Sequence, residues 1–148
     1  MSTPSFRVLD PATGAVVAER PFAEHKEIGR ALDRAREARR SWAATPLAER
    51  IRAVTAFVDA FVSDRDAAAA EITAQIGRPM KWAPGEVGGF EQRARHMLSV
   101  ADQALADVTP PVIAGFDRRI VRRPHGVVLV LSPWNYPLLT AVNAVIPA

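Results

Sequence analysis

The stretch GVVLVLSPWNYPLLTAVNAVIPA, residues 126–148, decides the fold class of this chain. Its continuous run of branched apolar residues, 127–131, is typical of a strand buried on both faces of a parallel sheet. The hexapeptide SPWNYP follows, and TAVNAVIPA then fits the start of a crossover helix that Pro147 bends or ends. We therefore predict an α/β fold that contains the first strand and helix of a doubly wound sheet. The second strand that such a unit requires is missing from the sequence, so the fold is expected to be incomplete.

Upstream of this stretch, the sequence predicts a small β ribbon followed by four helices. Alternating residues on either side of a turn with Pro11 and Gly14 predict the ribbon within the first twenty residues. Thr45 is expected to cap the second helix, and Gly77 suits the left-handed residue that ends the third. Apolar residues at helical spacing predict helices over residues 28–42, 46–62, 63–76 and 87–105.

The segment between the fourth helix and the apolar run resembles an exposed strand. RRIVRR, residues 118–123, is β-branched at its centre and charged on both flanks. This pattern is typical of an edge or hairpin strand, because flanking charges discourage uncontrolled pairing with another chain. We therefore expect a β element near residues 112–124.

Composition limits the class of protein. The 148 residues are 49% apolar and 24% charged, which is typical of a globular chain. The formal net charge is only +3, and the arginines alternate with Asp and Glu along the expected helices, so a nucleic-acid partner is the least favoured interpretation. No apolar run approaches the roughly 20 residues that a membrane span needs. The opening MSTPSFRVLD lacks the basic segment and apolar core of a signal peptide, so we expect a cytoplasmic protein.

Several kinds of site are disfavoured. The chain contains no cysteine, which excludes disulfides, thiolate metal sites and a thiol nucleophile within it. The three histidines, His25, His96 and His125, lie far apart in the sequence without metal-ligand spacing, so no metal site is predicted. The glycines of GEVGGF, residues 85–90, follow no strand, and we interpret them as helix-entry residues rather than a dinucleotide-binding loop.

The hexapeptide SPWNYP, residues 132–137, is the candidate site. It lies just beyond the expected strand, and ligands of open α/β sheets bind outside the carboxyl ends of the strands. Pro133 and Pro137 restrict the backbone on either side of Asn135. Two interpretations stay open from the residues alone. The Asn135 amide could donate hydrogen bonds to an oxyanion, or it could cap a rigid strand-to-helix turn.

A family resemblance favours the first interpretation. PHGVVLVLSPWNYPL, residues 124–138, resembles the stretch that marks the aldehyde dehydrogenase superfamily, where a Pro-x-Gly-Val-Val strand leads into Pro-Trp-Asn-x-Pro. VLDPATGAVVAERP, residues 8–21, resembles the N-terminal ribbon of that family, and residues 30–54 resemble its first helix pair. QIGRP, residues 75–79, resembles the Glu-Thr-Gly-Lys-Pro turn, with Gln75, Ile76 and Arg78 as departures.

This resemblance implies an NAD(P)-dependent oxidation of an aldehyde to a carboxylic acid. In the family a cysteine thiolate attacks the aldehyde and a glutamate later activates water. Asn135 would be the catalytic residue that donates its amide to the oxyanion, and Tyr136 would border the aldehyde tunnel. The residues that would line the NAD or NADP site are Leu131, Ser132, Pro133 and Trp134.

Residues 1–148 are therefore expected to form the N-terminal part of the aldehyde dehydrogenase cofactor-binding domain, with an oligomerisation β element near 112–124. The parent enzyme is expected to be a homo-oligomer that acts on a small-molecule aldehyde. Because the family's cysteine and glutamate are not among these residues, the isolated chain is expected to be inactive. The alternative is a catalytically dead, standalone helical interaction module that pairs with a full-length enzyme. The choice between NAD and NADP and the identity of the aldehyde stay open.

Overall fold

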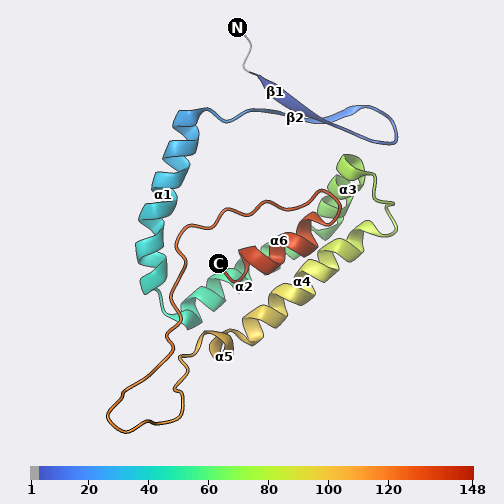
Figure 1. Cartoon of the computed structure of the whole chain (residues 1–148). Helices are drawn as coiled ribbons and strands as arrows, with labels where there is room; N and C mark the ends of the chain where they lie inside the picture. The colour runs from blue at the N-terminus through green and yellow to red at the C-terminus, as the bar shows by residue number, and fades with distance from the viewer. Residues whose placement is uncertain (1–3) are drawn as a thin grey trace.

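The computed structural model describes residues 4–148. The predicted domain over residues 1–148 and the predicted ribbon region both include residues 1–3, which lie outside this range. The chain forms a β ribbon, a long helix that stands apart, a group of packed helices and an extended return segment (Figure 1). The ribbon strands are β1 (Ser5–Leu9) and β2 (Val16–Pro21). The helices are α1 (His25–Ala44), α2 (Leu47–Ser63), α3 (Arg65–Ile76), α4 (Ala83–Ser99), α5 (Ala101–Leu105) and α6 (Pro137–Val145).

The N-terminal ribbon confirms the sequence prediction. Strands β1 and β2 pair antiparallel, from Ser5 opposite Pro21 to Leu9 opposite Val16. The connecting turn is closed by the Asp10 carboxylate, which accepts a hydrogen bond of 2.7 Å from the backbone N–H of Ala12. Gly14 has a φ of 73°, a conformation that glycine adopts without steric cost.

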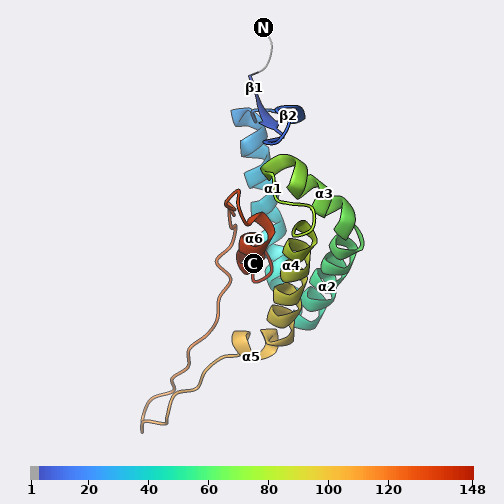
Figure 2. The same cartoon turned by 90° about the vertical axis from the view of Figure 1, so that its right-hand side faces the viewer.

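The core lies where α2, α4 and α6 pack together (Figure 2). Its buried apolar residues are Val58 of α2, Phe90 and Ala94 of α4, and Val142 and Ile146 at the C-terminal end of the chain. Helix α3 packs on the other part of α4 and adds a smaller buried cluster. Helix α6 is therefore held by apolar contacts along α4, which positions the hexapeptide that precedes it.

Charged side chains connect α2, α3 and α4 on their exposed faces. Arg95 Nη2 lies 2.7 Å from Asp59 Oδ1 and 3.0 Å from Glu91 Oε1. Its hydrogen bonds to these carboxylates, first of all the one to Asp59, raise the pKa of Arg95. Arg65 Nη2 lies 2.8 Å from Glu91 Oε2. These ion pairs include no residue of α6, and exposed pairs of this kind contribute little to stability.

Helix α1 forms as predicted, but its apolar face is not buried. Ile28 is 48% exposed and Leu32 43% exposed, and no residue of α1 is buried. Figure 1 shows α1 extending away from the packed helices. An amphipathic helix with an uncovered apolar face lacks the partner that its sequence pattern requires.

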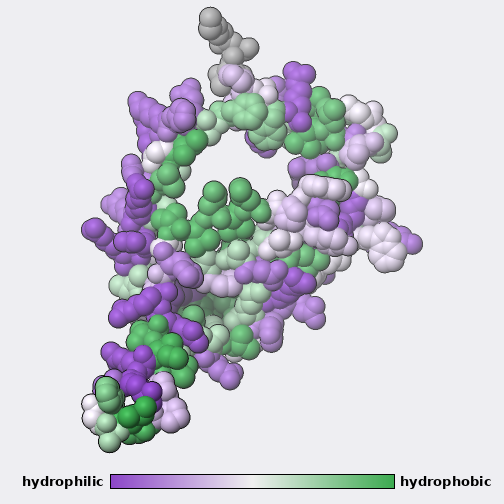
Figure 3. Space-filling model, viewed as in Figure 1, coloured by the Kyte–Doolittle hydropathy of each residue, from purple (hydrophilic) through white to green (hydrophobic). Residues whose placement is uncertain are grey.

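The prediction that residues 127–131 form a buried strand is wrong. The segment is extended, but it forms no strand among residues 4–148. Leu129 is 82% exposed and Leu131 83% exposed, and Figure 3 shows a band of apolar surface over the extended segment. The physical reason is that a strand exists only through hydrogen bonds to a neighbouring strand, and no described segment pairs with this one. The α/β class therefore rests on the helices and the two-stranded ribbon.

The β element predicted near 112–124 is reduced to isolated bridges. Val108 pairs with Ile120, and Ile113 pairs with Phe116, without a continuous ladder. The segment projects from the body of the molecule beyond α5 (Figure 1). A hairpin without a third strand or a packed face is only marginally stable, which explains the incomplete pairing.

Some helix boundaries differ from prediction. The predicted cap of α2 by Thr45 is wrong, because Pro46 occupies the N-cap position and no side chain in the described range caps the helix. The Thr45 hydroxyl instead donates a hydrogen bond of 2.9 Å to the Ser41 carbonyl at the end of α1. The expected fourth helix is two helices, α4 and α5, which are separated at Val100. Gly77 ends α3 with a φ of 73°, as predicted. No helix in the described part of the chain is long and apolar enough to cross a membrane.

Candidate functional site

The hexapeptide 132–137 lies against the connection between α3 and α4. A cleft opens between them, and its walls come from residues 76–86 and residues 134–139. Trp134, Asn135 and Tyr136 all line this cleft. Two segments joined by hydrogen bonds between residues 52 to 57 positions apart thus meet at the predicted site.

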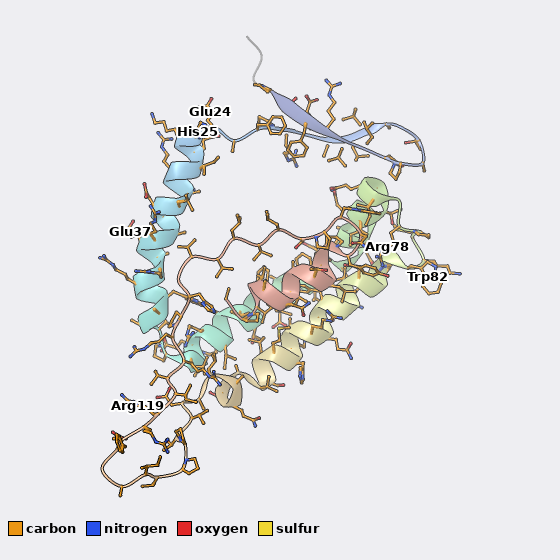
Figure 4. The ribbon with its side chains drawn as sticks, in the orientation of Figure 1. Glu24, His25, Glu37, Arg78, Trp82 and Arg119 are labelled. Atoms are coloured by element: carbon orange, nitrogen blue, oxygen red, sulfur yellow. The ribbon has the colours of Figure 1, made fainter. Side chains whose placement is uncertain are left out.

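Arg78 attaches the hexapeptide to the α3–α4 connection. Its Nη2 donates a hydrogen bond of 2.7 Å to the backbone carbonyl of Asn135. The guanidinium carbon lies 4.4 Å from the centre of the Tyr136 ring, which is within cation–π range. Figure 4 shows Arg78 beside the start of α6. Arg78 therefore holds the backbone at Asn135 and the ring at Tyr136 simultaneously.

Glu86 caps α6 from a neighbouring helix. Its Oε1 accepts hydrogen bonds of 3.1 Å from the backbone N–H groups of Leu138 and Leu139. These groups belong to the first turn of α6, where helix geometry leaves backbone donors without partners. Tyr136, the residue at the N-cap position, forms no side-chain cap. The negative charge of Glu86 also suits the positive end of the helix dipole.

The Glu86 carboxylate is buried, with a residue exposure of only 1%. Its Oε2 lies 3.3 Å from Arg78 Nη2, and no hydrogen bond to Oε2 forms among residues 4–148. A buried charge is costly unless it is paired, so Arg78 and Glu86 depend on each other. One arginine nitrogen thus links a buried carboxylate to the Asn135 backbone.

The Asn135 side chain itself is exposed at the cleft. Within the described residues it takes part in no hydrogen bond, whereas its backbone carbonyl is bound by Arg78. The cap of the turn is Glu86, so the interpretation of the Asn135 amide as a capping group loses its structural basis. Tyr136 lies beside Asn135 and is 47% exposed.

The four residues expected to line a cofactor site precede Asn135 on extended backbone. Leu131 is 83% exposed and Trp134 is 74% exposed, and Ser132 and Pro133 are exposed between them. Of these four residues, only Trp134 lines the cleft. Among residues 4–148 there is no group of three or more His, Asp or Glu side chains that could hold a metal ion.

Sequence reasoning missed Glu86 and treated Arg78 only as a departure from a family pattern. A signal for Glu86 was present, because it occupies the apolar face of α4. Ala83, Val87, Phe90 and Ala94 are its buried neighbours at helical spacing. An acidic residue on such a face requires a buried partner. The identity of that partner, the start of α6, could not be read from local sequence.

Comparison with known proteins identifies the class of protein. The family model described as the aldehyde dehydrogenase family matches residues 1–148. The chain belongs to the aldehyde dehydrogenase family, in agreement with the resemblance found in the sequence.

Individual relatives give the extent of the match. A mitochondrial succinate-semialdehyde dehydrogenase of Arabidopsis thaliana is 30% identical over 146 residues, which are 97% of this chain and 27% of that protein. The NADP complex of an NADP-dependent glyceraldehyde-3-phosphate dehydrogenase from Bacillus halodurans C-125 superposes with a TM-score of 0.85 at 26% identity, covering 97% of this chain and 31% of that one. PnpE in complex with nicotinamide adenine dinucleotide gives a TM-score of 0.87 at 27% identity, with coverages of 97% and 30%.

These matches confirm the predicted fold class. The helices and the two-stranded ribbon correspond to the N-terminal part of the aldehyde dehydrogenase fold. The chain spans less than a third of the length of these relatives.

Proposed function

We propose that residues 1–148 supply the oxyanion donor and part of the nicotinamide site of an NAD(P)-dependent aldehyde dehydrogenase. The observation that carries this proposal is that the Asn135 backbone is fixed while its side-chain amide is free, within the described residues, to bind a ligand. Its backbone is held by Arg78 and by the start of α6, while its amide has no protein partner in the described residues. Family membership of the whole chain supports the same role.

The proposed reaction requires an oxyanion donor that is positioned before the substrate arrives. A cysteine thiolate, supplied by a part of the enzyme outside these residues, forms a bond to the aldehyde carbon. The carbonyl π electrons move to the oxygen, and the Asn135 amide donates a hydrogen bond to the resulting oxyanion. Such a donor is effective because its dipole needs no reorganisation when the charge develops.

The proposed cofactor is NAD or NADP, as in the two solved relatives. When bound, it accepts the hydride that leaves the substrate carbon. Leu131, Ser132, Pro133 and Trp134 would form one wall of its site, because their exposed apolar surface lies directly before Asn135. Tyr136 would border the path of the aldehyde, which the exposed position of its ring in the cleft supports.

The isolated 148-residue chain is expected to show no aldehyde-dependent reduction of NAD or NADP. It contains no cysteine, so the covalent step has no nucleophile. The measurement is absorbance of the reduced nicotinamide with the purified chain, several aldehydes and both cofactors.

The matched control is a full-length enzyme, which here means a polypeptide that contains residues 1–148 together with the family's catalytic cysteine. The full-length enzyme should turn over under the same conditions. Turnover by the isolated chain, after contaminating host enzymes are excluded, would contradict the proposed mechanism.

Two further properties belong to the same proposal. The projecting segment near 112–124 would take part in homo-oligomerisation, since Val112 is 91% exposed and Phe116 69% exposed at its tip. A standalone module that pairs with a full-length enzyme would use the same surface, and it would bind that enzyme without restoring activity to a cysteine-free chain. The cytoplasmic location stays a prediction from the sequence.

A further inference from the structure

We propose that Arg78 and Glu86 are positioning residues that aim the Asn135 amide at the substrate oxygen. This inference rests on the proposed function of Asn135. It assigns a role in the reaction to an ion pair that lies in α4 and in the α3–α4 connection, outside the hexapeptide.

The first step of the argument concerns the backbone on both sides of Asn135. On its own carbonyl, Asn135 accepts a hydrogen bond of 2.7 Å from Arg78 Nη2. Three and four residues later, the backbone N–H groups of Leu138 and Leu139 are bound by Glu86 Oε1 at 3.1 Å each. Pro137 between them restricts φ. The backbone at Asn135, from which the side chain extends, is therefore constrained by contacts to two residues distant in sequence.

The second step is that these two contacts form one unit. Arg78 Nη2 makes both the hydrogen bond to Asn135 and the 3.3 Å ion pair with Glu86 Oε2. The Arg78 side chain is 18% exposed and that of Glu86 is fully buried. Removal of the charge of Arg78 or of Glu86 leaves the other charge unpaired and largely shielded from water. A substitution of Glu86 should therefore change the position of Asn135 in two ways, through its ion pair with Arg78 and through its hydrogen bonds to the first turn of α6.

The third step separates positioning from simple support of α6. The helix has other attachments to α4, because Arg93 Nη1 donates a hydrogen bond of 2.9 Å to the Leu139 carbonyl and Val142 is fully buried in the core. At Gly89 the two helices approach so closely that an added Cβ would lie within 3.3 Å of Leu139 Cγ. These contacts keep α6 on α4 without the carboxylate. Glu86 and Arg78 instead act at the first turn and at Asn135.

The test uses the full-length enzyme and the single-turnover rate of aldehyde-dependent nicotinamide reduction. Glu86→Gln keeps an acceptor for the α6 amides but removes the charge that holds Arg78, and Arg78→Met removes the donor to Asn135. Each is expected to slow this rate about ten- to a hundredfold, since a displacement of about 1 Å can cost a hundredfold. The KM for the cofactor should change little. Arg78→Lys should restore most of the rate, because a single nitrogen makes both the hydrogen bond to Asn135 and the ion pair with Glu86.

Matched controls come from the ion pair between Arg65 at the start of α3 and Glu91 of α4. Glu91→Gln and Arg65→Met remove the partners of a 2.8 Å pair that does not contact α6. Both variants should keep the single-turnover rate within about twofold of the parent, as expected for a partly exposed pair. A comparable slowing in these controls would mean that a general loss of charge on α3 and α4 explains the effect, and would overturn the inference.

A double-mutant cycle with Asn135→Ala gives the decisive readout. If Glu86 acts through the Asn135 amide, Glu86→Gln should not slow an enzyme that already lacks this amide, so the two effects should not add. Equal slowing in both backgrounds would overturn the inference, as would an unchanged rate in Glu86→Gln and Arg78→Met. An unchanged rate in Asn135→Ala alone would overturn the proposed function itself. If Glu86→Gln does not fold, Arg78→Met decides the same cycle, because Arg78 is partly exposed.

Discussion

Asn135→Ala in the full-length enzyme is expected to lower aldehyde turnover about a hundred- to a thousandfold, the usual loss for one oxyanion donor. The side chain has no hydrogen-bond partner in the described residues, so its removal breaks no hydrogen bond among residues 4–148. The affinity for NAD or NADP should stay nearly constant, because the amide serves the substrate oxygen and not the cofactor. Turnover, cofactor binding and melting temperature should be measured on the same preparation.

Two variants sharpen this prediction. Asn135→Gln keeps an amide but moves it by one methylene, and it should remain strongly impaired because the donor must lie within hydrogen-bond distance of the oxyanion. Gln92→Ala removes an exposed amide from α4 and should leave turnover unchanged. If Asn135 instead acted only as a turn cap, Asn135→Ala would cost about 1 kcal/mol of stability and leave the rate per folded molecule normal. That result would contradict the proposed catalytic role of Asn135.

The isolated 148-residue chain is expected to fold poorly and to form partly helical, dye-binding assemblies. Residues 127–131 are extended and unpaired within the described range, with Leu129 82% and Leu131 83% exposed. Exposed backbone donors next to large apolar side chains are a template for association. The measurement is sedimentation velocity over a concentration series, together with fluorescence of an apolar dye.

Replacing both leucines tests whether this segment drives association. Burial of one leucine contributes about 1.5–3 kcal/mol, so Leu129→Lys with Leu131→Lys should weaken association on the order of a hundredfold or more. The charge-matched control is Ala56→Lys with Ala70→Lys, which adds the same charge on exposed positions of α2 and α3. The control should associate nearly as strongly as the parent. A monodisperse parent chain with a sharp cooperative thermal transition would contradict the expectation.

Local sequence was sufficient for the elements whose physics is local. The ribbon follows from alternation around Asp10 and Gly14, and its turn closes through contacts within five residues. The end of α3 follows from Gly77, whereas the break between α4 and α5 at Val100 was not predicted. The helical stripe that contains Phe90 was recognised because burial repeats every three to four residues.

Elements that depend on distant partners were predicted less well. The run 127–131 has the composition of a buried strand, but strand hydrogen bonds belong to a pair of segments and not to one. The β element predicted near 112–124 is reduced to two bridges for the same reason. Thr45 was expected to cap α2, but its hydroxyl donates a hydrogen bond to the Ser41 carbonyl of the preceding helix.

For the candidate site, the sequence by itself determined which residues stand together: Trp134, Asn135 and Tyr136 between two prolines, after an apolar run, in the pattern of the aldehyde dehydrogenase family. Only the tertiary structure decided what holds them. The Asn135 carbonyl is bound by Arg78, 57 positions earlier, and α6 is capped by Glu86, 52 positions before Leu138. Local spacing cannot encode such contacts, because a buried carboxylate finds its partners only after α4 and α6 have packed.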